Sequence, residues 1–229
     1  MGLILSIETA VSVCSVAVHD HGRLVGILEV VGENVHGRKL VPLIQGLLTH
    51  TGISKKDLTA VSVSKGPGSY TGLRIGVSTA KGLAYALDIP LIGVDTLEAM
   101  ARGYLNGCTA NDVVIPMLDA RRMEVYAKII APNGEMLLES QPIVVGPLSF
   151  GEYMGGGRTF FVGDACDKVS SVIKHSNAVF IQCFPSARTV GELAYEKYHS
   201  GDFEDIAYFE PNYLKEFMVI KSKKNVLNP

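Results

Sequence analysis

The sequence lacks long hydrophobic runs, paired cysteines and a strong net charge, and each absence excludes a class of protein. No apolar run approaches the roughly 18 residues that a membrane-spanning helix needs. The four cysteines form no C-x-x-C pair, which argues against a zinc knuckle or a redox dithiol and fits a reduced, cytoplasmic protein. A formal net charge of −2 gives no field over the whole molecule that attracts nucleic acid or an anionic membrane. With 47% hydrophobic residues among 229, the chain is expected to fold into a globular protein.

The common signatures of catalytic and metal sites are also missing. None of the six histidines forms the i, i+4 pair that presents two imidazoles to one metal ion, and no G-x-S-x-G elbow occurs. The glycine-proline-glycine turn at residues 66–68 is followed by no Lys-Ser or Lys-Thr pair, and Thr71 occupies the third glycine position of G-x-G-x-x-G. The sequence therefore predicts no catalytic residue and no metal ligand. The turn itself is either a structural strand-to-helix corner or a small anion-attracting nest.

The hydrophobic pattern predicts the same plan twice. The first half is expected to contain strands at residues 3–9, 12–19, 23–31, 60–63 and 91–94, and helices at about 34–50, 70–87 and 95–104. The second half is expected to contain strands at residues 113–118, 124–130, 159–162 and 179–181, and a further strand that begins at 136. Its helices are expected to begin at about residue 147, to follow residue 164, and to span 186–199. The polar stretch 103–112 marks a boundary, so residues 1–105 are predicted to form an N-terminal lobe and 106–229 a C-terminal lobe with a basic tail.

This plan is similar to that of the actin-like ATPases and sugar kinases, an α/β fold of two lobes with mixed sheets and crossover helices (the ASKHA, ribonuclease H-like class). Enzymes of that class bind nucleotide between the lobes, where glycine-rich hairpins approach the phosphates. Here Glu8 and Asp119 end the equivalent first strands, and neither following hairpin has the glycine that lets a backbone approach a phosphate. The two acids are either a carboxylate pair across a cleft, as weak candidates for a cofactor contact, or ordinary caps of their turns.

The helix expected at residues 70–87 has small residues at every fourth position. Gly72, Gly76, Ala80 and Ala84 share one stripe, although a helical glycine costs about 1 kcal/mol relative to alanine. Close approach of another backbone would compensate that cost, and the backbone belongs either to the chain's own sheet or to a partner helix.

Four segments of this sequence closely resemble the TsaB (YeaZ) family, which is needed for threonylcarbamoyladenosine in bacterial tRNA. They are residues 3–10 (LILSIETA), 66–76 (GPGSYTGLRIG), 81–84 (KGLA) and 93–97 (GVDTL). The resemblance is specific over the first hundred residues and looser through 119–121, 163–164 and 211–215.

The resemblance implies a non-catalytic scaffold with no cofactor of its own. Such a subunit pairs with the TsaD-type transferase, is joined by the TsaE-type ATPase, forms homodimers when alone, and meets tRNA indirectly, while ATP and metal belong to the partner subunits. Its interface helices map onto residues 36–50 and 70–87 here. The partner-facing residues are accordingly expected to be His36, Leu40, Leu43, Ile44, Leu47, Tyr70, Gly72, Gly76, Ala80 and Ala84.

Two other functions remain open from the sequence. The chain is an actin-like enzyme in its own right, an ATPase or an M22-type metallopeptidase, if Glu8 and Asp119 serve a bound nucleotide or metal. It is a direct tRNA-binding module if its basic tail carries affinity, and the lysines of that tail are Lys215, Lys221, Lys223 and Lys224.

Overall fold

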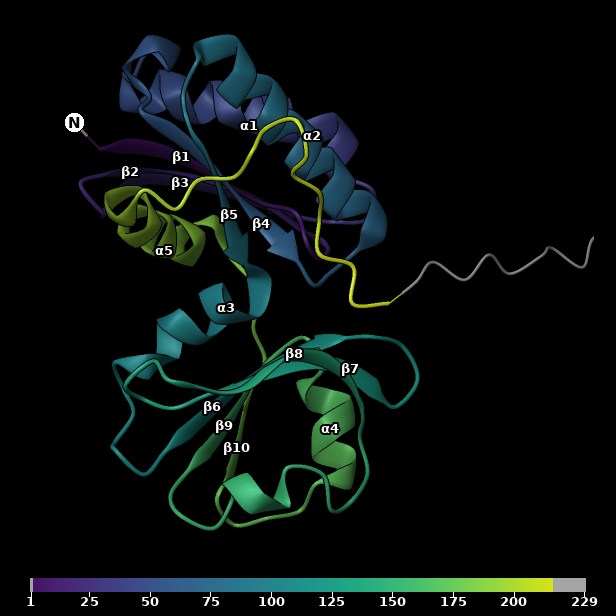
Figure 1. The fold of residues 1–229 in the computed structure, drawn as a ribbon. Coiled ribbons are helices and arrows are strands. Elements are labelled where there is room, and N and C mark those ends of the chain that lie inside the picture. Colours follow the sequence, from purple (N-terminus) through teal and green to yellow (C-terminus); the bar gives the residue numbers. More distant parts are fainter. Residues whose placement is uncertain (1, 216–229) are drawn as a thin grey trace, which may run out of the picture.

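Two five-stranded mixed sheets form the framework of the chain, in a computed structural model that describes residues 2–215 (Figure 1). The first sheet has the order β3-β2-β1-β4-β5, with β1 (Leu3–Glu8), β2 (Val13–Asp20), β3 (Arg23–Val31), β4 (Ala60–Gly66) and β5 (Leu91–Asp95). The second has the order β10-β9-β6-β7-β8, with β6 (Val113–Asp119), β7 (Glu124–Ile130), β8 (Met136–Val144), β9 (Thr159–Gly163) and β10 (Ala178–Ile181).

The two sheets share one pairing pattern. In each, the first three strands pair antiparallel, and the last two are parallel to the first. Consecutive antiparallel strands need only a short turn, whereas each parallel pair needs a crossover. The duplicated plan expected from the sequence is therefore confirmed.

The helices begin and end where capping residues allow. They are α1 (His36–Thr51), α2 (Tyr70–Leu87), α3 (Thr96–Leu105), α4 (Cys166–Val172) and α5 (Ala187–Ser200), with short 3-10 turns η1 (Lys55–Asp57) and η2 (Gly151–Tyr153). The side chain of Ser69 accepts the Gly72 N–H at the start of α2, and Asp95 accepts the Glu98 N–H at the start of α3. Gly52, at φ 70°, ends α1 in the left-handed conformation that glycine adopts without strain.

The first sheet is covered on both faces. Alternate residues of β1 point to opposite faces, so Leu5 and Ile7 join the cluster under α1 and α2, whereas Ile4 joins a cluster with Val190 and Ala194 of α5. The predicted lobe boundary is therefore wrong for α5, which was assigned to the C-terminal lobe but packs on the N-terminal sheet (Figure 1). The second sheet has its own cluster beneath α4.

One expected helix is absent. The segment from about residue 147 contains only the three-residue turn η2, and Leu148 in it is 91% exposed. Glycines at 146, 151 and 155–157 make a helix costly here, so the prediction was wrong.

A hydrophobic cluster and the C-terminal segment connect the lobes. Leu97 and Met100 of α3 pack with Leu118 of β6 and with Val11 from the β1–β2 turn. After α5 the chain runs back along the first lobe (Figure 1), where the Asn212 N–H donates to the Lys65 carbonyl. No helix within residues 2–215 is long and apolar enough to cross a membrane.

Candidate functional site

The small-residue stripe of α2 faces the chain's own sheet. A Cβ at Gly72 would lie 2.1 Å from the Thr9 carbonyl oxygen, and one at Gly76 would lie 2.2 Å from Thr9 Oγ1. Ala80 and Ala84 are fully buried in the same core. Of the two explanations for the stripe, internal packing holds. All four residues are buried by the chain's own atoms, so the structure gives no support to the expectation that they contact a partner.

The expected interface residues of α1 are also mostly internal. Leu40, Ile44 and Leu47 are buried in the core, and His36 is buried with Nε2 3.2 Å from the Val13 carbonyl oxygen. Leu40 and Leu47 seat the helix on its own sheet, as the apolar stripe of an amphipathic helix does, whereas Ile44 also lines the groove described below, so its partner role stays a prediction. Leu43 is half-buried.

Tyr70 begins α2 beside the C-terminal segment. Its ring lies 4.9 Å from that of Tyr213, and the Arg74 guanidinium lies 4.3 Å above it. The tyrosine is half-buried and engaged within the chain. Of the ten expected interface residues, Leu43 and Tyr70 are half-buried and the other eight are buried.

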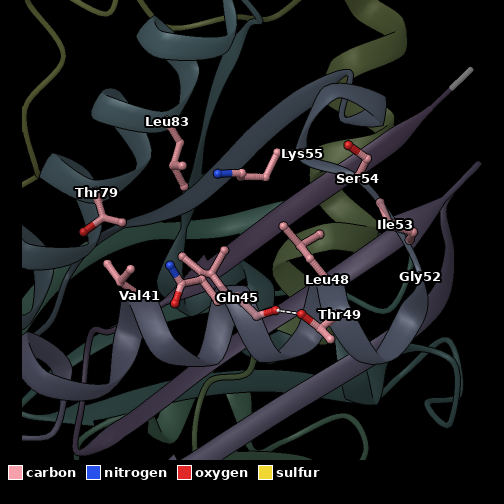
Figure 2. A pocket seen from close by; sticks show the side chains of 11 residues that line it. Val41, Gln45, Leu48, Thr49, Gly52, Ile53, Ser54, Lys55, Thr79 and Leu83 are labelled. Carbon is pink, nitrogen blue, oxygen red and sulfur yellow. Dashed lines mark hydrogen bonds between the residues drawn. The ribbon is translucent and has the colours of Figure 1, made fainter.

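An open groove lies between α1, α2 and η1. It has a volume of about 800 Å³, and Ile44 and Leu48 lie among its lining residues. Figure 2 shows Val41, Gln45, Leu48 and Thr49 on α1, with Thr79 and Leu83 of α2 on the opposite side and Lys55 between them. Val41 is 51% exposed, although its side chain is apolar.

Sequence reasoning placed one groove residue, Ile44, in the expected interface but took its residues of α2 mainly from the buried stripe. A second set of small residues, Ser78, Thr79 and Gly82, lies off that stripe and also favours an intermolecular use. A Cβ at Gly82 would meet no atom within 4 Å, so this glycine faces open space. Val41 gives a similar signal in α1, because it is apolar and exposed at the edge of the buried stripe, three residues before Ile44.

Glu8 is enclosed within the first lobe. Its carboxylate accepts the Ala10 N–H at 2.5 Å, and its other oxygen, Oε2, is buried without a hydrogen-bond partner. Burial raises the pKa of Glu8 to about 7, which keeps the carboxyl partly protonated near neutral pH.

The turn after Glu8 leaves little room for a phosphate. A Cβ at Gly68 would lie 2.6 Å from the Ala10 carbonyl oxygen, so the two turns are in direct contact. Val11, next in the chain, is packed into the inter-lobe cluster. The hairpin that approaches nucleotide in actin-like enzymes is thus occupied by the chain's own packing.

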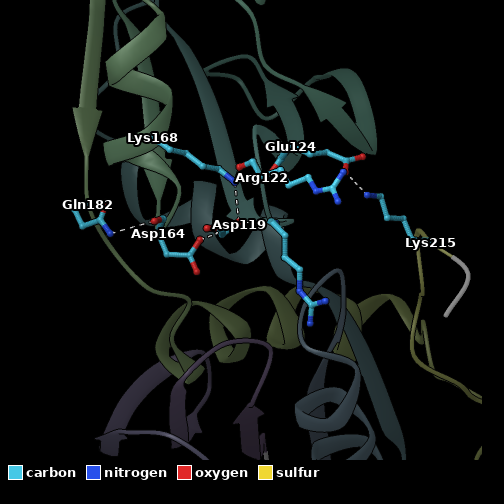
Figure 3. Close-up of polar contacts among 8 residues, drawn as sticks. Asp119, Arg122, Glu124, Asp164, Lys168, Gln182 and Lys215 are labelled. Carbon is cyan, nitrogen blue, oxygen red and sulfur yellow. Dashed lines mark hydrogen bonds and ion pairs between the residues drawn. The ribbon is translucent and has the colours of Figure 1, made fainter. Parts of the chain in front are cut away.

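Asp119 occupies the equivalent place in the second lobe but has different surroundings. It accepts hydrogen bonds from Lys168 Nζ at 2.7 Å and from the Arg121 N–H at 2.6 Å (Figure 3). Partial burial raises the pKa of Asp119, but the hydrogen bonds from Lys168 and the Arg121 N–H, together with the charge of Lys168, lower it overall. No hydrogen bond or ion pair in residues 2–215 joins Glu8 to Asp119, and each acid accepts the N–H of a residue in its own turn.

Among the described residues, no group of three or more histidine, cysteine, aspartate or glutamate side chains is arranged to hold a metal ion. Of the tail lysines, only Lys215 is described, and it forms an ion pair with Glu124. Lys221, Lys223 and Lys224 lie outside the described residues.

Comparisons with known proteins agree with one another. The family model described as "TsaD: tRNA N6-adenosine threonylcarbamoyltransferase" matches residues 13–196. The tRNA threonylcarbamoyladenosine biosynthesis protein TsaB of Escherichia coli (strain K12) is 32% identical over 225 residues, which cover 93% of this chain and 94% of that protein.

The solved structures agree in fold. YeaZ from Pseudomonas aeruginosa is 27% identical, with a TM-score of 0.79 over 93% of this chain and all of that one. The activator of the 2-hydroxyisocaproyl-CoA dehydratase from Clostridium difficile, solved with bound ADPNP, is 12% identical with a TM-score of 0.54, covering 87% of this chain and 97% of that one. The latter likeness concerns the fold alone. Together these structures confirm the expected two-lobed actin-like architecture.

Proposed function

Because this chain belongs to the TsaB family, with a role in tRNA threonylcarbamoyladenosine biosynthesis, we propose that it is the non-catalytic subunit that binds and activates a TsaD-type threonylcarbamoyltransferase. The single observation that carries the proposal is the open apolar groove between α1 and α2. Exposed apolar surface of this kind is a common mark of a protein-binding site. The transferase would supply the chemistry, and ATP and metal would be held by partner subunits.

The groove suits a partner helix better than a small molecule. The walls from α1 and α2 leave an open groove lined by apolar side chains such as Val41 and Leu48, together with polar ones such as Gln45 and Thr49. An amphipathic helix inserts its apolar side chains into such a channel. A specific pair would bury roughly 1,200 to 2,000 Å² in total.

The same surface would serve the isolated protein. Two copies docked through their grooves would form a homodimer, which the transferase displaces when it binds. We further propose that a TsaE-type ATPase joins the assembled pair, and that the protein works in the cytoplasm, where its tRNA pathway operates.

Substitution in the groove tests this function. Val41→Asp and Leu83→Asp each place a charge on the groove wall and should weaken binding to a TsaD-type partner at least 100-fold by calorimetry, because the carboxylate must be desolvated. Val25→Asp is the matched control, since Val25 is 46% exposed on β3, outside the groove. It should bind normally.

The melting temperature of each variant separates loss of binding from loss of folding. Groove variants that fold and bind the transferase as tightly as the parent chain would show that the partner docks elsewhere. Sedimentation of the same variants measures whether the homodimer dissociates, as expected if both assemblies use the groove.

A further inference from the structure

The turn between β6 and β7 holds two arginines in a backbone conformation that long side chains avoid. Arg121 has φ 70° and Arg122 has φ 47°, both in the left-handed region that favours glycine. Strain of this kind is retained where the surrounding structure fixes it, and it is concentrated at functional sites.

Surrounding groups hold this turn firmly. Asp119 accepts the Arg121 N–H, and the Glu124 N–H donates to the Arg121 carbonyl at 3.1 Å. Lys168 Nζ, from α4, donates to the Arg122 carbonyl at 3.1 Å and to the Glu124 carbonyl at 2.6 Å (Figure 3). The turn is therefore a rigid platform for its two side chains.

Both guanidinium groups are left without a partner. The two arginines are exposed, and neither side chain has a hydrogen bond or ion pair within residues 2–215. The neighbouring acids are already neutralised, because Asp119 pairs with Lys168 and Glu124 pairs with Lys215 (Figure 3). A protein of net charge −2 thus presents two unpaired cations on one rigid turn.

We propose that Arg121 and Arg122 contact the phosphate backbone of the tRNA substrate, an inference that rests on the proposed function. The planar guanidinium donates two parallel hydrogen bonds to a phosphate, and adjacent arginines can engage successive phosphates of one strand.

A polynucleotide fits these observations better than a free nucleotide does. The arginines are exposed on a turn and do not line an enclosed pocket, and the equivalent hairpin of the first lobe is filled by Ala10 and Val11. A flexible polyanion needs only accessible cations, whereas a bound nucleotide needs walls for its base and ribose.

The test compares tRNA binding by the assembled complex containing either the parent chain or the variant Arg121→Gln/Arg122→Gln. Binding of labelled tRNA is measured by fluorescence anisotropy between 50 and 200 mM salt. We expect affinity to fall about tenfold at low salt, and the slope of log K against log salt to decrease in magnitude by about 1 to 2, because each lost phosphate contact removes roughly 0.7 to 0.9. Affinity for the transferase should not change.

Three comparisons make the result decisive. Arg23→Gln/Lys174→Gln removes the same charge from other exposed positions and should bind tRNA normally. Arg121→Gly/Arg122→Gly suits the left-handed backbone and should lose tRNA binding while folding at least as well as the parent chain. Arg121→Lys/Arg122→Lys should retain most of the salt slope with weaker affinity.

Unchanged tRNA affinity and salt slope in the glutamine variant would overturn the proposal. If the glutamine variant loses transferase binding, the turn contacts an acidic protein surface. If ATP shields the two arginines from tRNA, the turn binds a nucleotide. Either result also overturns the proposal. The isolated chain, tested with tRNA at 50 mM salt, separates this inference from the proposed function. If the complex never assembles but the isolated chain binds tRNA through the two arginines, only the proposed function fails.

Discussion

Two alanine substitutions in α2 should change stability in opposite directions. Gly72 and Gly82 lie in the same helix, and each becomes Ala, so the chemical change is identical. At Gly82 the new Cβ meets no atom within 4 Å, and the helix gains up to about 1 kcal/mol from the higher helix propensity of alanine. For a chain of this size that gain raises the melting temperature by about 2 to 4 °C.

At Gly72 the same methyl group has no room. Its Cβ would lie 2.1 Å from the Thr9 carbonyl oxygen, a backbone atom that cannot rotate away, so α2 must move off β1. Overpacking of this kind typically costs 1 to 3 kcal/mol, and the gain in helix propensity offsets only part of it. We expect a net loss of about 2 kcal/mol, or about 4 to 8 °C in melting temperature.

Calorimetry and urea unfolding of the two variants measure both effects. Gly76→Ala should lie between them, because its clash is with the Thr9 hydroxyl, a side-chain atom that can rotate. A Gly72→Ala variant as stable as the parent chain would refute the seating of this stripe on β1. Reduced transferase affinity in a fully folded Gly72→Ala variant would show that the small-residue stripe contributes to the partner surface.

Two further predictions concern the acids and the turn. The pKa of Glu8 rises from 4.5 to about 7 on folding. Its contribution to stability is therefore complete below pH 4.5 and is lost as pH rises through 7. At 1.36 kcal/mol per pKa unit, the free energy of unfolding falls by about 3 kcal/mol over this range. Glu8→Gln should therefore remove a fall in stability between pH 4.5 and about 7. Asp119→Asn, whose parent carboxyl has a lowered pKa, should remove a loss of stability that appears as pH falls. Identical pH profiles for Glu8→Gln and the parent chain would contradict the first expectation. Lys168→Met removes the ion pair of Asp119 and the donor to the Arg122 carbonyl, and should cost about 2 kcal/mol and speed amide exchange at Glu124. Unchanged exchange would show that the turn holds its shape without the lysine.

The strands and most helices could be predicted because they follow from local patterns. For example, the expected strand at residues 113–118 is observed as Val113–Asp119, and the expected helix at 186–199 is observed as Ala187–Ser200. Alternating or continuous apolar residues, bounded by turn residues, are sufficient for such assignments. The failed helix from about residue 147 lies where this pattern is weakest and glycine is most frequent.

The placement of α5 could not be predicted from its own pattern. An amphipathic stripe shows that a helix covers something, but it does not identify the sheet that the helix covers. The more specific signal was Gly191, where a Cβ would lie 2.0 Å from His19 Nδ1 of β2. Recognising that contact required the three-dimensional partner, because His19 and Gly191 lie in different halves of the sequence.

The candidate site was predicted at the level of helices and missed at the level of residues. Sequence pattern and family resemblance both pointed to α1 and α2, but both selected the apolar and small residues that seat these helices on their own sheet. Every helix on a sheet needs such a buried face, so apolar periodicity identifies the core first. A binding surface is indicated instead by apolar or small residues that are exposed beside the buried stripe or away from it, such as Val41 and Gly82.

The two hairpin turns differ in packing and in charge. In the first lobe, the half-buried Val11 packs with Leu97, Met100 and Leu118. A nucleotide phosphate placed there would have to displace this contact and meet a carboxyl that is partly neutral. In the second lobe the equivalent turn has exposed charged side chains, and Lys168 fixes its shape. Packing in one turn and exposed cations in the other therefore favour a subunit that joins its lobes and presents surfaces to larger partners over one that closes around ATP.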